Sequence, residues 1–204
     1  MKTKILMILA VVMTALMSCG TSQEEKIQFT NNAAELQVKM PANIESIRFI
    51  DSVFIPAVQK EFDPKIVFST EKEKTFSNFS HWEGFEKMLY NDASKVGPTA
   101  GFWLKIYQTT KTTTDLEILS QTGGKILSES EFFQALYYLV SSQPNGNSGK
   151  MLVKHYGNIF HVKNKHGVAV SAYPFWSSVS GAWLLCAYEF GGWNRGLLVF
   201  SRGN

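Results

Sequence analysis

Hydrophobic and polar positions along the chain predict helical structure near its start. A helix is expected after Asn43, with a kink at Pro56. Its apolar side is formed by residues three or four positions apart: Ile47, Ile50, Phe54 and Val58. The apolar segment 65–69, which follows a proline, predicts a short strand.

Two capping boxes mark where later helices begin. In this motif a serine side chain bonds the backbone three residues on, and a glutamate at that position reaches back. Ser80 and Glu83 fit the motif and precede three apolar residues on one helical face: Phe85, Met88 and Leu89. Ser128 and Glu131 fit it again, and they precede the strongly apolar helix predicted over residues 132–140.

The second half of the chain is strand-rich. Five apolar segments are separated by turn residues, at 151–156, 159–164, 168–176, 183–190 and 197–202. They predict an antiparallel meander. A hairpin is also expected between residues 102–108 and 116–121, because the threonine-rich stretch between them suits strand and turn. The fold class is therefore α+β, with about three helices on one face of an antiparallel sheet and a C-terminal five-strand meander.

The beginning of the chain has the pattern of an export signal. Lys2 and Lys4 precede an apolar run over residues 5–17, which is shorter than the roughly 20 residues that a membrane-spanning helix needs. The run ends in Leu16-Met17-Ser18-Cys19, which resembles the lipobox of bacterial lipoprotein precursors.

This resemblance implies cleavage before Cys19 and attachment of lipid to its sulfur and amine. Each buried CH₂ contributes about 0.8 kcal/mol, so several acyl chains anchor a protein firmly. In that family, a residue such as Gly20 after the cysteine permits transfer to an outer membrane, although the leaflet is left open. We expect residues 1–18 to be the removed signal peptide, 19–26 the lipidated cysteine and a flexible tether, and 27–204 one globular domain. The alternative is an ordinary secretory signal with an incidental cysteine.

Cysteine and charge counts narrow the function classes. Once Cys19 carries lipid, Cys186 has no partner for an intrachain disulfide. Removing Lys2 and Lys4 with the signal leaves eighteen basic against seventeen acidic residues, so the mature chain is nearly neutral. Basic residues are in mild excess in the last third without forming a cluster, which argues against a nucleic-acid partner. The oligomeric state is left open.

Candidate catalytic and metal-binding groups are few. The sharpest catalytic hypothesis is a thiolate pair of Cys186 with His155 or His161. Strand alternation instead places Cys186 toward the core, where a thiol is inert. The four histidines are scattered over different predicted elements: His81, His155, His161 and His166. We therefore expect no catalytic residues, no metal and no cofactor.

Aromatic residues crowd into the last strands and form the remaining candidate site. Flat rings beside amide and guanidinium donors suit a sugar or peptide ligand. The candidate binding residues are Trp193, Arg195, Asn194, Trp183 and Trp176. The alternative is that the strand residues fill the core and that Trp193 folds back over the end of the sheet.

Three function classes follow from these observations. The favoured one is an exported, lipid-anchored binding or accessory module of the cell envelope, which contacts the membrane through its lipid and takes a glycan, peptide or protein ligand. A membrane-anchored inhibitor or immunity-type protein with a protein partner is the second class. An envelope hydrolase with an unrecognised site is the third.

Overall fold

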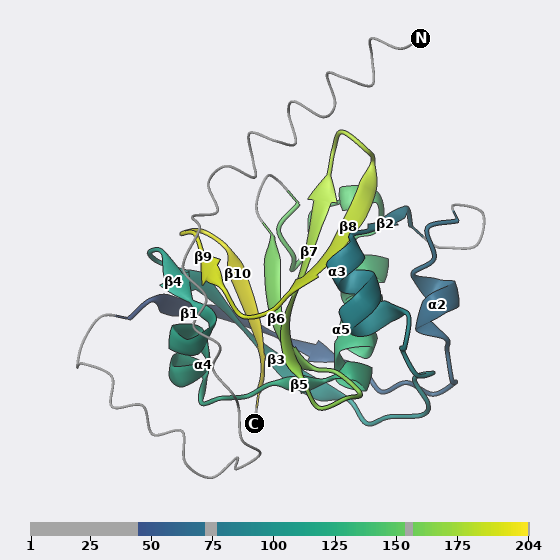
Figure 1. Ribbon diagram of the computed structural model, residues 1–204, viewed down its shortest axis with the longest axis horizontal. Coiled ribbons are helices and arrows are strands. Elements are labelled where there is room, and N and C mark those ends of the chain that lie inside the picture. The colour runs from purple at the N-terminus through teal and green to yellow at the C-terminus, as the bar shows by residue number, and fades with distance from the viewer. Residues whose placement is uncertain (1–44, 72–76, 154–156, 204) are drawn as a thin grey trace. The chain divides into compact units, whose positions relative to one another are not determined.

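A mixed β-sheet runs through the described part of the chain. The computed structural model describes residues 45–71, 77–153 and 157–203, so the expected signal peptide, Cys19, the tether and His155 lie outside the described residues (Figure 1). The strands of the main sheet are β1 (Ile47–Ile55), β2 (Phe79–His81), β3 (Phe102–Thr109), β5 (Leu127–Ser128), β6 (Asn158–Lys163), β7 (Ala169–Ser177), β8 (Ala182–Tyr188) and β10 (Leu198–Arg202). A second, two-stranded sheet joins β4 (Thr113–Thr114) to β9 (Gly192–Trp193).

Helices lie on both sides of this sheet. They are α2 (Pro64–Val67), α3 (Glu83–Phe85), the π-helix η2 (Glu86–Tyr90), α4 (Asp115–Thr122), α5 (Glu129–Ser142) and the 3₁₀ turn η3 (Pro144–Gly146). Figure 1 shows α2, α3 and α5 gathered on one side, whereas α4 lies on the other. The α+β class is confirmed, but the expectation that all helices cover one face is wrong because α4 packs on the opposite face.

The strand order shows which part of the predicted meander forms. The main sheet has the order β1-β3-β10-β6-β7-β8-β2, with β5 pairing β6. β6, β7 and β8 are consecutive antiparallel neighbours, as predicted. β10 instead lies between β3 and β6 and runs parallel to β6, so the sheet is mixed and not a five-strand meander. Residues 151–153 form no strand, and the rest of the predicted strand 151–156 lies outside the described residues.

The predicted helix after Asn43 is wrong, because residues 47–55 form strand β1. β1 pairs antiparallel with β3, and its register shifts by one residue between Phe49 and Asp51. Such a bulge changes the alternation of side chains at that point. The apolar residues before and after it are therefore spaced as they would be on a helix.

The predicted strand at 65–69 is also wrong. Asp63 caps α2 by accepting a hydrogen bond from the backbone N–H of Lys65 at 2.9 Å, and Pro64 occupies the first helical position. The capping box at Ser80 does not form either, because Ser80 lies in β2 beside β8. The helix there begins at Glu83, which forms an ion pair with Lys87.

Two capping boxes do form, and one of them was not predicted. Ser128 and Glu131 exchange hydrogen bonds at the start of α5, which confirms that prediction. Thr114 and Glu117 exchange the same bonds at the start of α4. Residues 116–121 are therefore helix and not the second strand of a hairpin. The first strand of that hairpin is confirmed as β3.

The sheet has two faces with different covers. We call the face that packs against α3 and α5 the core face; its side chains include Val53, Leu104, Phe160, Phe200 and Leu185. We call the other the back face, where a smaller buried cluster lies beneath α4: Ile47, Ile118, Ile159, Leu197 and Val199. Each strand contributes alternate residues to the two faces.

Candidate functional site

Two of the predicted binding residues lie in the main core. Trp183 is fully buried among the core-face residues, and Trp176 packs against the same cluster. Their rings meet edge to face, with centroids 5.8 Å apart. These two tryptophans therefore fill the core, which was the alternative for the strand residues, and they do not join Trp193.

Trp193 lies on the back face, in the loop between β8 and β10. Its indole stacks on the ring of Tyr173 with centroids 5.2 Å apart, and it packs against the smaller cluster. Its Nε1 donates a hydrogen bond to Asp115 Oδ1 at 2.6 Å. Of its predicted companions, Asn194 offers its backbone carbonyl to the Thr109 hydroxyl at 2.8 Å, and Arg195 is exposed. The loop is thus fastened to the sheet, with Trp193 folded back over it.

A buried carboxylate, which the sequence analysis did not find, holds this loop. Asp115 begins α4 and is fully buried. Its Oδ1 lies 2.6 Å from His161 Nε2, and its Oδ2 accepts the backbone N–H of Gly191 at 2.7 Å. With the Trp193 bond, three groups from β6 and the loop meet one carboxylate. A buried carboxylate needs such partners, so this network fixes the loop to the start of α4.

Ser171 lies next to His161 in the sheet, which places a serine, a histidine and an aspartate near one another. Ser171 is the direct partner of His161 across β6 and β7. Its hydroxyl is buried and makes no hydrogen bond to any group in the described part of the chain. A catalytic serine needs a hydrogen bond to its base and access for a substrate. Since Ser171 and Asp115 are fully buried and His161 is 3% exposed, the arrangement serves packing in this conformation.

Cys186 is buried, as predicted, but on the back face and not in the main core. It is paired with Tyr173 across β7 and β8, and it is 1% exposed. Burial raises the pKa of its thiol to about 12, although a hydrogen bond with Tyr188 acts in the opposite direction. A thiol with so high a pKa is a poor nucleophile at neutral pH.

The described histidines are engaged separately. His81 Nε2 lies 2.7 Å from the carbonyl of Phe68, and burial lowers the pKa of its imidazole. His166 contacts Asp92 at the surface. Within residues 45–71, 77–153 and 157–203, no group of three or more His, Cys, Asp or Glu side chains could hold a metal ion.

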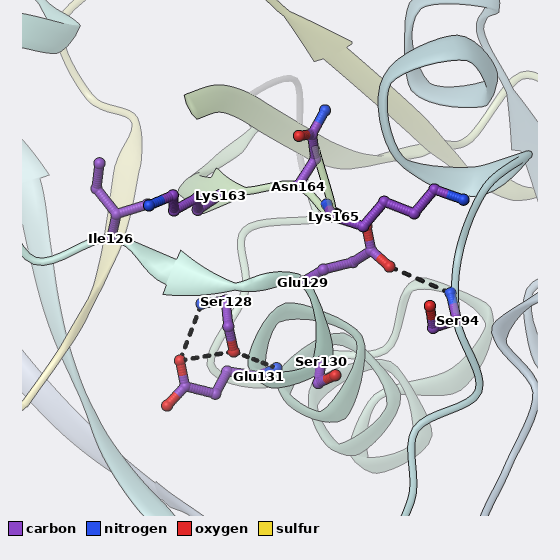
Figure 2. A pocket seen from close by; sticks show the side chains of 9 residues that line it. All are labelled: Ser94, Ile126, Ser128, Glu129, Ser130, Glu131, Lys163, Asn164 and Lys165. Carbon is purple, nitrogen blue, oxygen red and sulfur yellow. Dashed lines mark hydrogen bonds between the residues drawn. The ribbon is translucent and has the colours of Figure 1, made fainter. Parts of the chain in front are cut away.

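An open pocket of about 470 Å³ lies at the start of α5 (Figure 2). Its lining combines serines, acids and lysines: Ser94, Ile126, Ser128, Glu129, Ser130, Glu131, Lys163, Asn164 and Lys165. Glu129 accepts the backbone N–H groups of Ser94 and Lys165, at 3.2 and 3.0 Å. Glu131 caps the helix and also accepts from Arg202 Nε at 2.6 Å. The helix terminus is therefore already occupied by the chain's own carboxylates, which leaves little attraction for an anion.

Four aromatic side chains lie together on the uncovered rim of the back face, on β1 and β3. Phe49, Phe54 and Trp103 are 55%, 44% and 50% exposed, and Tyr107 is half-buried. Phe54 is directly paired with Trp103, and their ring centroids are 5.4 Å apart. Phe49 is paired with Tyr107 in the same way, with ring centroids 5.8 Å apart. We call these four residues the aromatic face.

The two ring pairs are separated by one polar row. Lys105 and its partner Ser52 lie between them, so the pairs are roughly 13 Å apart at the rise of an extended strand. Arg48 is exposed and bonds Gln108, its partner in the register, so both lie on the opposite side of the two strands from Phe49 and Tyr107. The acidic residue of β1, Asp51, is ion-paired with Lys150. Among the residues of β1 and β3, Lys105 is therefore the one charged residue that lies between the rings.

The sequence contained a signal for half of this site. In the correctly predicted strand 102–108, alternation places Trp103, Lys105 and Tyr107 on one face. Reading residues 47–58 as a helix hid their partners Phe49 and Phe54.

Comparisons with known proteins give no guide to the site. No protein-family model, curated protein or solved structure matches this chain, so its function is inferred from its own residues. In the part of the chain that the structure describes, no helix is long and apolar enough to cross a membrane.

Proposed function

We propose that the protein is an exported, lipid-anchored module of the cell envelope, which binds its ligand through the aromatic face. Export and anchoring rest on the sequence pattern that ends at Cys19. The observation that supports a binding role is the exposure of Phe49, Phe54 and Trp103 on two adjacent strands.

Several exposed aromatic rings on one surface leave a larger apolar area in water than single, scattered apolar residues do. Large apolar patches on soluble domains commonly mark contact sites, and tryptophan and tyrosine dominate the energetics of such sites. Within each pair the rings are neighbours through direct strand pairing, and the two pairs lie on the same face on either side of Lys105 and Ser52. The Gly191–Gly196 loop is the weaker choice, since the ring of Trp193 is already engaged with Tyr173 and Asp115.

The direct test is photocrosslinking from the proposed surface in living cells. Trp103 is replaced by a photoreactive phenylalanine derivative, and Val179 is replaced in the same way as the control. Val179 is 82% exposed in the turn between β7 and β8, far along the sheet from β3. We expect a discrete adduct from position 103 and none from position 179.

The outcomes of this experiment separate the function classes. A single protein adduct at position 103 supports the inhibitor or immunity-type variant of the proposal. A lipid or glycan adduct supports the binding-module variant. Equal or absent labelling at both positions would refute the aromatic face as a ligand surface.

Anchoring has its own test at Cys19. The variant Cys19→Ser removes the sulfur that lipidation requires, so the protein should no longer be retained by acyl chains. We expect its signal-cleaved form in the soluble envelope fraction, measured by blotting of washed membranes. Retention of that form in the membranes would contradict lipid anchoring through Cys19.

A further inference from the structure

The composition of the aromatic face narrows the class of its ligand. Its rings are two phenylalanines, one tryptophan and one tyrosine, and Ile50 beside them is 42% exposed. Phenylalanine and isoleucine offer no hydrogen bonds, whereas a sugar ligand requires directional polar partners for its hydroxyls. The surface therefore favours an apolar ligand over a glycan.

Charges next to the rings add a second constraint. Lys105 lies between the two ring pairs on the same face, and the one acid of β1 and β3, Asp51, is ion-paired with Lys150. Aromatic rings beside basic side chains are the combination that peripheral proteins use at a membrane surface. Anionic headgroups attract each nearby Lys or Arg, and the rings lie at headgroup level.

The aromatic face lies close in sequence to the expected lipidated cysteine. β1 begins at Ile47, which is 28 positions after Cys19. A chain of that length spans at most about 100 Å even when fully extended. A lipid on Cys19 would therefore keep β1 within that distance of a membrane, so lipid would be present at a high effective concentration.

We propose that the aromatic face rests on an anionic lipid surface, with Phe49, Phe54 and Trp103 among the headgroups and with Lys105 facing lipid phosphates. This inference rests on the proposed function, because it names the ligand of the same surface. Lipid anchoring would then fix the orientation of the domain as well as its location.

Tryptophan fluorescence of the mature lipidated protein in vesicles tests this contact. The vesicles contain phosphatidylethanolamine and phosphatidylglycerol with brominated acyl chains, which quench only nearby indoles. Trp103 is half-exposed on the aromatic face, whereas Trp183 is fully buried and Trp176 packs against the main core. The two remaining tryptophans lie away from the aromatic face: Trp82 follows β2 at the opposite edge of the sheet, and Trp193 is stacked on Tyr173. We expect quenching in the wild type that disappears in Trp103→Phe and persists in the control Trp176→Phe.

Further variants measure the two contributions separately. Phe54→Ser should reduce the ratio of docked to undocked protein roughly tenfold, because it removes a large apolar side chain from the contact. The matched control Val179→Ser changes an apolar residue that is more exposed but lies outside the aromatic face, and it should leave quenching unchanged. Lys105→Gln should reduce docking roughly fivefold, and the effect should vanish on neutral phosphatidylcholine vesicles. Arg48→Gln, on the opposite side of β1, is the control and should leave docking unchanged.

The results distinguish failure of this inference from failure of the proposed function. Equal quenching in wild type and Trp103→Phe would overturn the membrane contact. If position 103 then crosslinks to one protein, the binding function stands with a protein ligand. If neither quenching nor an adduct is found at position 103, both proposals fall.

Discussion

The two faces of the sheet carry similar aromatic side chains, which are buried on one face and partly exposed on the other. On the core face, large side chains such as Trp183 and Phe160 are fully buried beneath helices. On the back face, α4 and one loop cover only the centre, and Trp103 at the rim stays 50% exposed. The same residue type is thus core on one face and surface on the other. Aromatic content alone therefore does not locate a binding site, because the covering element decides which rings remain free.

Buried polar side chains fasten loops on both faces of the sheet. On the core side, amides join loops to helices; Gln134 of α5, for example, donates to the carbonyls of Pro56 and Ala100 at 2.7 and 3.2 Å. On the back face, the carboxylate of Asp115 gathers donors from His161 and the loop. Carboxylates and amides act on both sides, since Glu129 of α5 accepts the backbone N–H groups of Ser94 and Lys165, and Gln121 of α4 accepts those of Ser46 and Ile47. The loop over the back face is distinguished by the gathering of its donors on one buried carboxyl group.

The largest predicted effect is the contrast between two tryptophan truncations on the two faces. Trp183→Ala should lower the free energy of unfolding by about 3 to 5 kcal/mol, because it leaves a cavity in the main core. Trp103→Ala should lower it by less than about 1 kcal/mol, because half of that side chain is already in water. Urea denaturation of both variants measures the difference.

A similar loss of stability in both variants would break this contrast. It would mean that Trp103 is a packing residue, and the aromatic face would lose its distinction from the core. The variant Phe54→Ala provides a second measurement on the same surface, since Phe54 pairs with Trp103.

The next effect concerns the loop over the back face. Trp193→Ala should cost about 2 to 4 kcal/mol, because it removes both a stacked ring and a hydrogen-bond donor to Asp115. Trp193→Phe keeps the ring and should cost only about 1 to 2 kcal/mol. Arg195→Ala, in the same loop and exposed, is the control and should change stability by less than about 0.5 kcal/mol.

Thermal or urea unfolding separates the two interpretations of Trp193. If Trp193→Ala unfolds like the wild type, its ring does not hold the loop, and a ligand role for Trp193 regains support. A loss in the expected range makes the loop a structural cover.

Much of the strand content could be predicted, but the partners of the strands could not. Alternation located β3, β6, β7, β8 and β10 with small errors. Alternation does not specify which strands are neighbours, so the insertion of β10 between β3 and β6 was missed. The bulge in β1 interrupts the alternation of apolar and polar residues, so the sequence of this strand resembles that of a helix. Its strand conformation becomes evident from its pairing with β3.

Helix starts were predictable where the capping residues were recognised. The capping box at Ser128 correctly predicts the start of α5. Thr114 and Glu117 have the same spacing at the start of α4, but the surrounding threonines favour a strand prediction there. The exposed rings of the aromatic face could not be predicted for a different reason. Exposure depends on which element covers a strand, so sequence alone could not separate Trp103 from Trp183.

The smallest predicted effect concerns Cys186, which lies on the covered part of the back face. Burial raises the pKa of its thiol to about 12, so very little of the thiol is ionised near neutral pH. Labelling of the native protein by a thiol reagent should therefore be slow. Cys186→Ser should cost about 1 to 3 kcal/mol, because it places a hydroxyl in a largely apolar site.

The labelling rate also reports on the cover above this cysteine. Cys186 is paired with Tyr173, and Tyr173 stacks on Trp193. Trp193→Ala should therefore speed labelling at least tenfold while the protein remains folded, because loss of the indole frees the loop to open. Arg195→Ala is again the control. Fast labelling of the wild type would show that the centre of the back face is open, and the distinction between its covered centre and its exposed rim would have to be abandoned.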